Sequence, residues 1–282
     1  MFATRFAPSP TGRLHKGHAY SALSAYHAAK DAGGRFVLRI EDIDPTRCKP
    51  AFEHGIYEDL AWLGLDWELP VRRQSDHLDD YAAAVETLRQ RGLVYRCFRT
   101  RKEILDAIGN APHGAAEAVR PGPHAPDEEA ELLETGKPFA WRLSLETARE
   151  TIGGEAWDAL SFFEEGHGPD GERGRLKARP ETAGDVVLAR KDAGAAYHLA
   201  AVHDDALQGM THVIRGEDLF EATHIQRLIQ TLFDWPEPVY RHHRLLTGPD
   251  GKRYAKRDGS ITLQALRENS LTAPALKAEI GF

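Results

Sequence analysis

The first forty residues constrain the fold of this chain more than any other stretch. Residues 2–7 form a short run of alternating apolar side chains, and residues 36–40 (FVLRI) form a second apolar run. Between them, residues 19–32 are rich in alanine and other good helix formers, and the stretch ends at Gly33-Gly34. A strand, a helix and a strand in this order predict a parallel pair joined by a right-handed crossover.

The loop before this helix has the features of a phosphate site. His15 and His18 are three residues apart, so they fall on one face of the helix N-terminus, where unpaired N–H groups favour anions. Gly17 lets a ligand approach the backbone. Imidazoles here can donate hydrogen bonds to phosphate oxygens or to the charge that develops on them. The loop matches neither G-x-G-x-x-G nor the Walker A sequence, which excludes those two kinds of nucleotide site.

Strand and helix patterns alternate along the rest of the chain, which predicts an α/β fold with a Rossmann-like nucleotide-binding parallel sheet. Residues 100–180 are polar and rich in glycine and proline. We therefore expect a first half of the catalytic domain (1–99), an inserted lobe (100–180) and a second half (181–282). The alternative for the lobe is an exposed insertion without a role. The other predicted helices are 50–63, 77–91, 126–136 and 222–233, and the predicted strands are 93–98, 139–145, 185–190, 196–202 and 211–215.

Charge and cysteine content limit the class of protein. The net charge of −7 argues against nucleic-acid binding by bulk charge and leaves room for a local basic face. Two distant cysteines, Cys48 and Cys97, predict no disulfide framework. The N-terminus has no signal-peptide pattern, and no apolar run is long enough to span a bilayer. We expect a soluble cytoplasmic monomer without a membrane partner.

Three motifs give the chain a family resemblance. Residues 15–18 (HKGH) are similar to the H-x-G-H motif of class I aminoacyl-tRNA synthetases. Residues 5–12 (RFAPSPTG) and 39–47 (RIEDIDPTR) flank it at the spacing of the glutamyl branch. Residues 196–200 (AYHLA) and 213–219 (VIRGEDL) also resemble that branch, so the resemblance covers nearly the whole chain. In this family the inserted lobe contacts the tRNA acceptor end.

A basic segment near the C-terminus is the last motif. Residues 251–259 (GKRYAKRDG) carry four cations between two glycines. A solvated charge run is one interpretation, and a loop that clamps phosphates is the other. Its position matches the K-M-S-K-S loop of class I synthetases, with Arg253 and Ala255 as departures and Lys256 in place of the second lysine. The resemblance therefore implies ATP as cosubstrate and Mg²⁺ on the pyrophosphate. It also implies catalytic roles for His15, His18 and Lys256, and ATP contacts from those three residues and Gly17.

The substrate follows from charge. A dicarboxylic amino acid needs two cationic or donor sites and one anionic site. Arg5 and Arg215 can each grip a carboxylate, Glu41 can take the ammonium group, and Tyr197 can add a hydroxyl contact. The alternative is that both arginines are structural ion-pair residues. The family resemblance implies L-glutamate, activated as glutamyl-adenylate, in a site made by Arg5, Phe6, Ala7, Pro8, Ser9, Glu41, Tyr197 and Arg215.

The lobe departs from the family in its cysteines. The family carries C-x-C followed by further ligands of a structural zinc, whereas Cys97 is followed by Arg99 and by no later cysteine. Zinc needs about four ligands. We therefore expect no zinc, and we expect His113 and His124 to be loop residues.

The acceptor of the glutamyl group is the remaining question. The stretch after Gly259 is too short for a domain, so we expect no C-terminal anticodon-binding domain. Truncated members of the glutamyl branch transfer glutamate to the queuosine base at the wobble position of tRNA(Asp), and the resemblance implies that partner. Two alternatives stay open: a paralogue that charges a tRNA 3′ end, and a non-catalytic tRNA-binding regulator.

Overall fold

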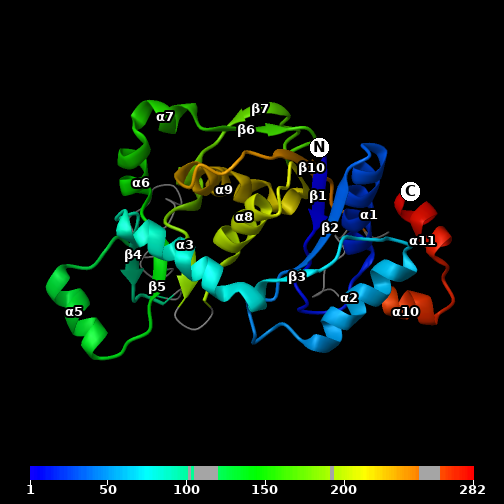
Figure 1. Ribbon diagram of the computed structural model, residues 1–282, viewed down its shortest axis with the longest axis horizontal. Helices are drawn as coiled ribbons and strands as arrows, with labels where there is room; N and C mark the ends of the chain where they lie inside the picture. Colours follow the sequence, from blue (N-terminus) through cyan, green and yellow to red (C-terminus); the bar gives the residue numbers. More distant parts are fainter. Residues whose placement is uncertain (101–102, 105–119, 191–193, 248–260) are drawn as a thin grey trace.

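The predicted α/β fold with a parallel sheet is confirmed (Figure 1). The computed structural model describes residues 1–100, 103–104, 120–190, 194–247 and 261–282. In the first part of the chain β1 and β2 pair in parallel across α1, and β3 adds a parallel strand beside β2. The elements of this part are β1 (Ala3–Phe6), α1 (Lys16–Asp31), β2 (Arg35–Ile40), α2 (Pro50–Trp62), β3 (Arg72–Arg73) and α3 (Leu78–Gln90).

A second sheet has the order β7-β6-β10-β9, in which β10 pairs in parallel with both β9 and β6. Thr211 donates a backbone hydrogen bond to the carbonyl oxygen of Ala3 at 3.0 Å, so β9 begins beside β1 and the two parallel groups adjoin. The carboxyl ends of β1 and β9 therefore meet at one edge, which is where α/β sheets bind ligands. The elements of this part are β6 (Ser161–Glu164), β7 (Gly174–Lys177), α8 (Tyr197–Leu207), β9 (His212–Gly216), α9 (Phe220–Leu232) and β10 (Val239–His243).

A small antiparallel sheet, β4-β5-β8, lies away from the first three strands (Figure 1). The segment predicted as an inserted lobe therefore contributes to two sheets, because β5 joins this one, while β6 pairs with β10 and β7 pairs with β6 in the second sheet. Its outermost helix is α5, at the opposite end of the molecule from α10 and α11 (Figure 1). The elements are β4 (Val94–Cys97), α5 (Pro126–Glu134), β5 (Ala140–Leu143), α6 (Leu145–Ile152), α7 (Gly154–Ala159), β8 (Val187–Arg190), α10 (Leu263–Glu268) and α11 (Ala273–Ile280).

Two large apolar clusters fill the molecule. One combines residues of α3, α6, α9 and β10, and the other packs α1 and α2 on β2. Leu263, Leu276 and Ile280 from the last two helices belong to this second cluster. The C-terminal helices thus complete the core of the N-terminal part. Among the helices that the structure describes, none has the length and apolar character needed to cross a bilayer.

One predicted strand is wrong. Residues 196–202 were expected to return as the second strand of a hairpin, but Ala196 is the N-cap of α8, which runs from Tyr197 to Leu207. The physical reason is the spacing of the buried residues, since Leu199, Val202 and Asp205 recur at helical intervals and face the interior together. The strands β6, β7 and β10 and the helices α6, α7, α10 and α11 were not predicted.

Candidate active site

A cavity of about 480 Å³ opens where the carboxyl ends of β1 and β9 meet the N-terminus of α1. Every predicted site residue within the described chain lines it. Lys256 lies outside the described residues, so its predicted role stays a prediction. The predicted residues on the cavity wall are Arg5, Phe6, Ala7, Pro8, Ser9, His15, Gly17, His18, Glu41, Tyr197 and Arg215.

The two histidines of the H-x-G-H motif cap α1. His15 is the N-cap residue, and its Nδ1 accepts the backbone N–H of Gly17 at 3.1 Å. His18 Nδ1 accepts the backbone N–H of His15 at 3.1 Å, and the two rings lie with their centroids 3.7 Å apart. The imidazoles therefore bind helix N–H groups that sequence reasoning had left to a phosphate. With Nδ1 as acceptor, a neutral ring carries its proton on Nε2, which makes that atom a donor.

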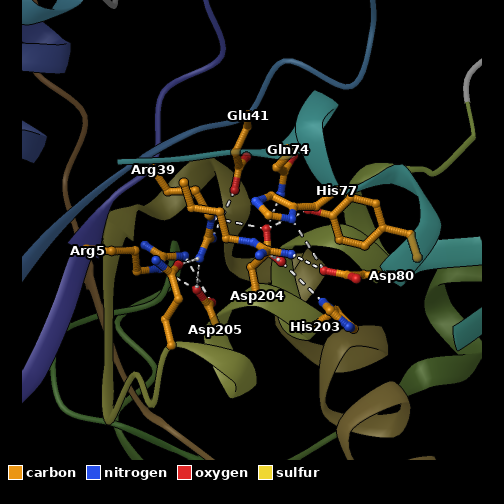
Figure 2. A network of polar contacts seen from close by, with 12 residues as sticks. Arg5, Arg39, Glu41, Gln74, His77, Asp80, His203, Asp204 and Asp205 are labelled. Carbon is orange, nitrogen blue, oxygen red and sulfur yellow. Dashed lines mark hydrogen bonds and ion pairs between the residues drawn. The ribbon is translucent and has the colours of Figure 1, made fainter. Parts of the chain in front are cut away.

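Arg5 is part of a buried ion-pair network (Figure 2). Its Nε and Nη2 donate to the two carboxylate oxygens of Asp205 at 3.0 and 3.3 Å. Arg39 donates to the same Asp205 at 2.8 Å and to Glu41 at 3.0 Å. Arg5 therefore forms the structural ion pair that the alternative interpretation expected, and it also lines the cavity.

The two carboxylates of this network differ in pKa. Burial raises the pKa of Glu41, and the nearby Arg39 and Arg5 cations offset this only in part. Burial also acts to raise the pKa of Asp205, but Arg5 and Arg39 together outweigh it and lower that pKa. Asp205 is thus held as the permanent anion that balances two arginines, and Glu41 at the cavity wall is the easier one to protonate.

The neighbouring residue, Asp204, ties α8 to the first part of the chain (Figure 2). Its carboxylate accepts hydrogen bonds from Arg72 at 2.9 Å, Gln74 at 3.0 Å and Tyr81 at 2.8 Å. Burial opposes ionisation, yet the hydrogen bond with His203, the Arg39 cation and the hydrogen bonds from Tyr81 and Gln74 lower the pKa of Asp204 to about 2. The C-terminal part of α8, the helix that begins at Tyr197, is consequently tied to β3 and α3.

Arg215 is the other cation of the cavity, and its partners are different in kind. It is 5% exposed, and no carboxylate among the described residues forms an ion pair with it. All its hydrogen-bond acceptors are neutral or can be so. They are His242 Nε2 (3.0 Å), the Tyr197 hydroxyl (3.3 Å), Gln226 Oε1 (2.9 Å) and Thr223 Oγ1 (2.8 Å). A buried guanidinium on a cavity wall without a direct counter-ion is suited to bind an anion.

Several residues of the cavity were missed by sequence reasoning. His243 is the last residue of β10, and its Nε2 lies 2.6 Å from the Ser21 hydroxyl. Asp218 and Leu245 also line the cavity. Asp218 lies within the quoted motif VIRGEDL, which could have indicated it, whereas His243 at the end of β10 and Leu245 after it carried no local signal.

The described residues contain no group of three or more histidine, cysteine or acidic side chains that could hold a metal ion. Cys97 is buried, and Arg99 Nη1 donates to the carbonyl oxygen of Pro121 at 3.1 Å. His124 Nδ1 lies 2.9 Å from Glu128. His113 lies outside the described residues. The expectation that the lobe binds no zinc remains a prediction.

Comparison with known proteins gives a consistent result. A family model described as tRNA synthetases class I (E and Q), catalytic domain, matches residues 1–153 and 164–276. The glutamyl-Q tRNA(Asp) synthetase of Rhodobacter capsulatus is 46% identical over 99% of each chain. The glutamate–tRNA ligase 2 of Dinoroseobacter shibae is 39% identical over 98% of this chain, which spans 60% of that relative. A glutamate tRNA ligase from Elizabethkingia meningosepticum, solved with its amino acid, is 29% identical, with a TM-score of 0.72 over 92% of this chain and 52% of its own.

Proposed function

This chain belongs to the class I (E and Q) tRNA synthetase catalytic-domain family, and we propose that it activates L-glutamate with ATP and transfers the glutamyl group to the queuosine base at the wobble position of tRNA(Asp). The match to the Rhodobacter capsulatus protein over nearly the full length of both chains supports this acceptor. Two further relatives with the same name, at 37 and 40% identity, support it as well.

The observation that carries the amino-acid specificity is the buried Arg215 with its neutral acceptors. A substrate carboxylate supplies the anion that this guanidinium lacks nearby. Tyr197 accepts from Arg215, so its own hydroxyl proton is left for a substrate oxygen. Glu41 receives the ammonium group, and the second carboxylate lies near Arg5, where Asp205 has already neutralised part of the charge. An acidic amino acid fits this pattern better than an amide or an apolar one.

The chemistry requires no protein nucleophile. An oxygen of the substrate α-carboxylate attacks the α-phosphorus of ATP, the bond from that phosphorus to the pyrophosphate oxygen breaks, and glutamyl-adenylate and pyrophosphate form. His15 and His18 at the mouth of α1 and Lys256 are proposed to stabilise the phosphate charge. Mg²⁺ brought in with ATP would neutralise further charge on the phosphates. A hydroxyl or amine group of the queuosine base then attacks the glutamyl carbonyl carbon and loses its proton to solvent, the bond from that carbon to the phosphate oxygen breaks, and AMP leaves.

The three-part organisation is kept in this proposal. Residues 1–99 and 181–282 form the catalytic domain, and the lobe 100–180 is its tRNA-contacting part. The pairing of β6 with β10, and of β7 with β6, joins the end of that lobe to the catalytic sheet.

The test uses purified protein with labelled glutamate, ATP and tRNA(Asp), with and without queuosine. We expect glutamate-dependent exchange between ATP and pyrophosphate in the absence of tRNA, and label only on the queuosine-containing tRNA. Label on both tRNAs would overturn the proposed acceptor. No exchange, with tRNA binding retained, would favour a non-catalytic regulator.

The second candidate is a ligase that charges the 3′ end of a tRNA. The similarity to the Dinoroseobacter shibae ligase over 98% of this chain favours it. Periodate oxidation of the tRNA 3′ terminus before the assay separates the two, because it blocks 3′ charging. Under the proposed function, RNase fragments bearing the anticodon retain the label.

A further inference from the structure

We propose that Glu164 and His242 are positioning residues that orient the Arg215 guanidinium toward the amino-acid cavity. Neither residue lines the cavity, and each acts through the next. This inference rests on the proposed function, because it explains how the Arg215 guanidinium is held in position to bind a substrate carboxylate.

The three side chains form a buried row across the second sheet. His242 on β10 lies directly opposite Arg215 on β9 in the parallel register. Its Nε2 is 3.0 Å from Arg215 Nε, and its Nδ1 is 2.6 Å from Glu164 Oε2. Glu164 and His242 are 0% and 1% exposed, so water does not compete for these contacts.

The direction of the hydrogen bonds fixes the protons. Arg215 Nε–H can only donate, so His242 Nε2 must offer a lone pair. The imidazole proton therefore sits on Nδ1 and is donated to the Glu164 carboxylate. Burial lowers the pKa of His242, and this outweighs the opposing effect of Glu164, so the ring is neutral at pH 7.

Glu164 is itself held in place by the backbone. Its Oε1 accepts the N–H groups of His242 at 2.9 Å and of Gly166 at 2.8 Å. A Cβ atom at residue 166 would lie 2.1 Å from the carbonyl oxygen of His242 and 2.9 Å from Glu164 Oε1, so only glycine allows this approach. The carboxylate thus accepts three N–H groups and cannot rotate toward Arg215 without losing them.

The imidazole between the two charges has a specific effect. Asp205 contacts Arg5 directly and occupies two of its N–H groups with a carboxylate. Glu164 instead balances Arg215 from one ring away, and His242 takes up only the Nε–H. The Nη groups on the cavity side consequently keep neutral partners, and a substrate carboxylate does not have to displace a protein anion.

The test is Glu164→Gln. A glutamine amide cannot accept all three N–H groups, because its nitrogen is a donor. Either the amide NH₂ then faces one of the N–H donors, or the His242 proton moves from Nδ1 to Nε2. In the second case the Nε2 proton points at Arg215 Nε–H and that hydrogen bond is lost. In the exchange assay without tRNA we expect KM for glutamate to rise roughly 10- to 100-fold, as for a lost charge-assisted contact. KM for ATP should not change, because the row does not reach the mouth of α1. Equal changes in both constants, or an unchanged KM for glutamate in a folded variant, would overturn the proposal.

A matched control is His224→Gln. His224 is also a buried histidine, 2% exposed, and its Nδ1 accepts the backbone N–H of Arg179 without contact to Arg215. It should cost stability while leaving KM for glutamate unchanged.

A second measurement does not depend on activity or on the variant folding. In ¹⁵N-labelled wild-type protein, NMR of the His242 ring should show a protonated Nδ1 and an unprotonated Nε2. A proton on Nε2 would overturn the proposal whatever the kinetics give. If wild-type protein shows no glutamate-dependent exchange while the ring has the expected tautomer, the proposed function fails and the geometry of the row stands.

Discussion

At the scale of single residues, the cavity contains two arginines that are neutralised in different ways. Arg5 has Asp205 as a direct partner, and Arg215 has four neutral acceptors with a carboxylate one ring further away. Because charge attraction falls with distance, Glu164 offsets the charge of Arg215 less than Asp205 offsets that of Arg5, and Arg215 attracts an anionic ligand more strongly. This makes Arg215 the more selective probe of the amino-acid site.

We expect Arg215→Lys to raise KM for glutamate by roughly 10- to 100-fold in the exchange assay, because an ammonium group cannot reproduce the planar fork or its bonds to Thr223 and Gln226. The control is Arg241→Lys. Arg241 lies on the adjacent strand, is partly exposed and pairs with Glu165 at 2.7 Å, so its replacement should leave KM unchanged. A similar KM for both variants and wild type would contradict the role of Arg215.

The sequence predicted cavity residues best where they belong to a contiguous motif. Arg5, His15 and Glu41 lie close together along the chain and converge on one wall. It gave no indication of Glu164 or His242, since their link joins positions 78 residues apart through buried polar atoms. Buried polar pairs of this kind leave no periodic pattern, and only the folded geometry identifies them.

At the scale of elements, α8 shows why the hairpin prediction failed. Its first residues follow a stretch, 191–194, whose composition suggests a hairpin turn, and they include tyrosine and valine, which favour a strand over a short window. The helix is instead favoured by ion pairs with residues far away in the sequence. Asp204 binds Arg72, and Asp205 binds Arg5 and Arg39. On a helix, these two consecutive aspartates can reach both sets of arginines. The helices at 50–63, 77–91 and 222–233 were predicted because their apolar periodicity is sustained over three turns or more.

The packing of α2 on α10 yields a pH-dependent prediction. Asp59 of α2 is fully buried, its carboxylate accepts no hydrogen bond from the described residues, and Arg267 Nη1 of α10 is 3.8 Å away. Burial raises the pKa of Asp59 to about 6, with Arg267 and Arg13 opposing. The folded state therefore binds this proton more tightly than the unfolded state, and stability falls as pH rises from about 4 to 6, by at most about 3 kcal/mol.

We expect Asp59→Asn to raise the free energy of unfolding by about 1–2 kcal/mol at pH 7 and to give no gain below pH 4, where Asp59 is neutral in both states. Urea unfolding at the two pH values measures this. Asp79→Asn, at an exposed position of α3, serves as control and should change stability by less than about 1 kcal/mol. A gain of equal size at both pH values would exclude the burial of charge as its cause.

At the scale of the whole molecule, the two ends of the chain form one unit. The backbone N–H of Leu263 donates to the carbonyl oxygen of Leu14 at 2.8 Å, and Thr262 forms a β-bridge with His15. Leu263, Leu276 and Ile280 then pack into the apolar cluster under α1 and α2. Sequence patterns did not indicate that the residues after 260 support the H-x-G-H helix, because that contact spans almost the entire chain.

We expect Leu276→Ala to lower the free energy of unfolding by roughly 2–4 kcal/mol, as for a fully buried leucine whose removal leaves a cavity. The control is Ile261→Ala, at a side chain that is 58% exposed, which should cost less than about 1 kcal/mol. Denaturant unfolding of both variants decides the matter. Equal costs would show that α11 adds nothing to the core of the first part.

The joining of the chain ends also has a consequence for how the protein is made. During synthesis, α1, α2 and β2 leave the ribosome before α10 and α11, so the apolar surface that these two helices cover stays open until residues 263–280 have been made. The phosphate end of the cavity can therefore take its final form only after these residues emerge, and an apolar face that is open in the meantime favours association with other chains.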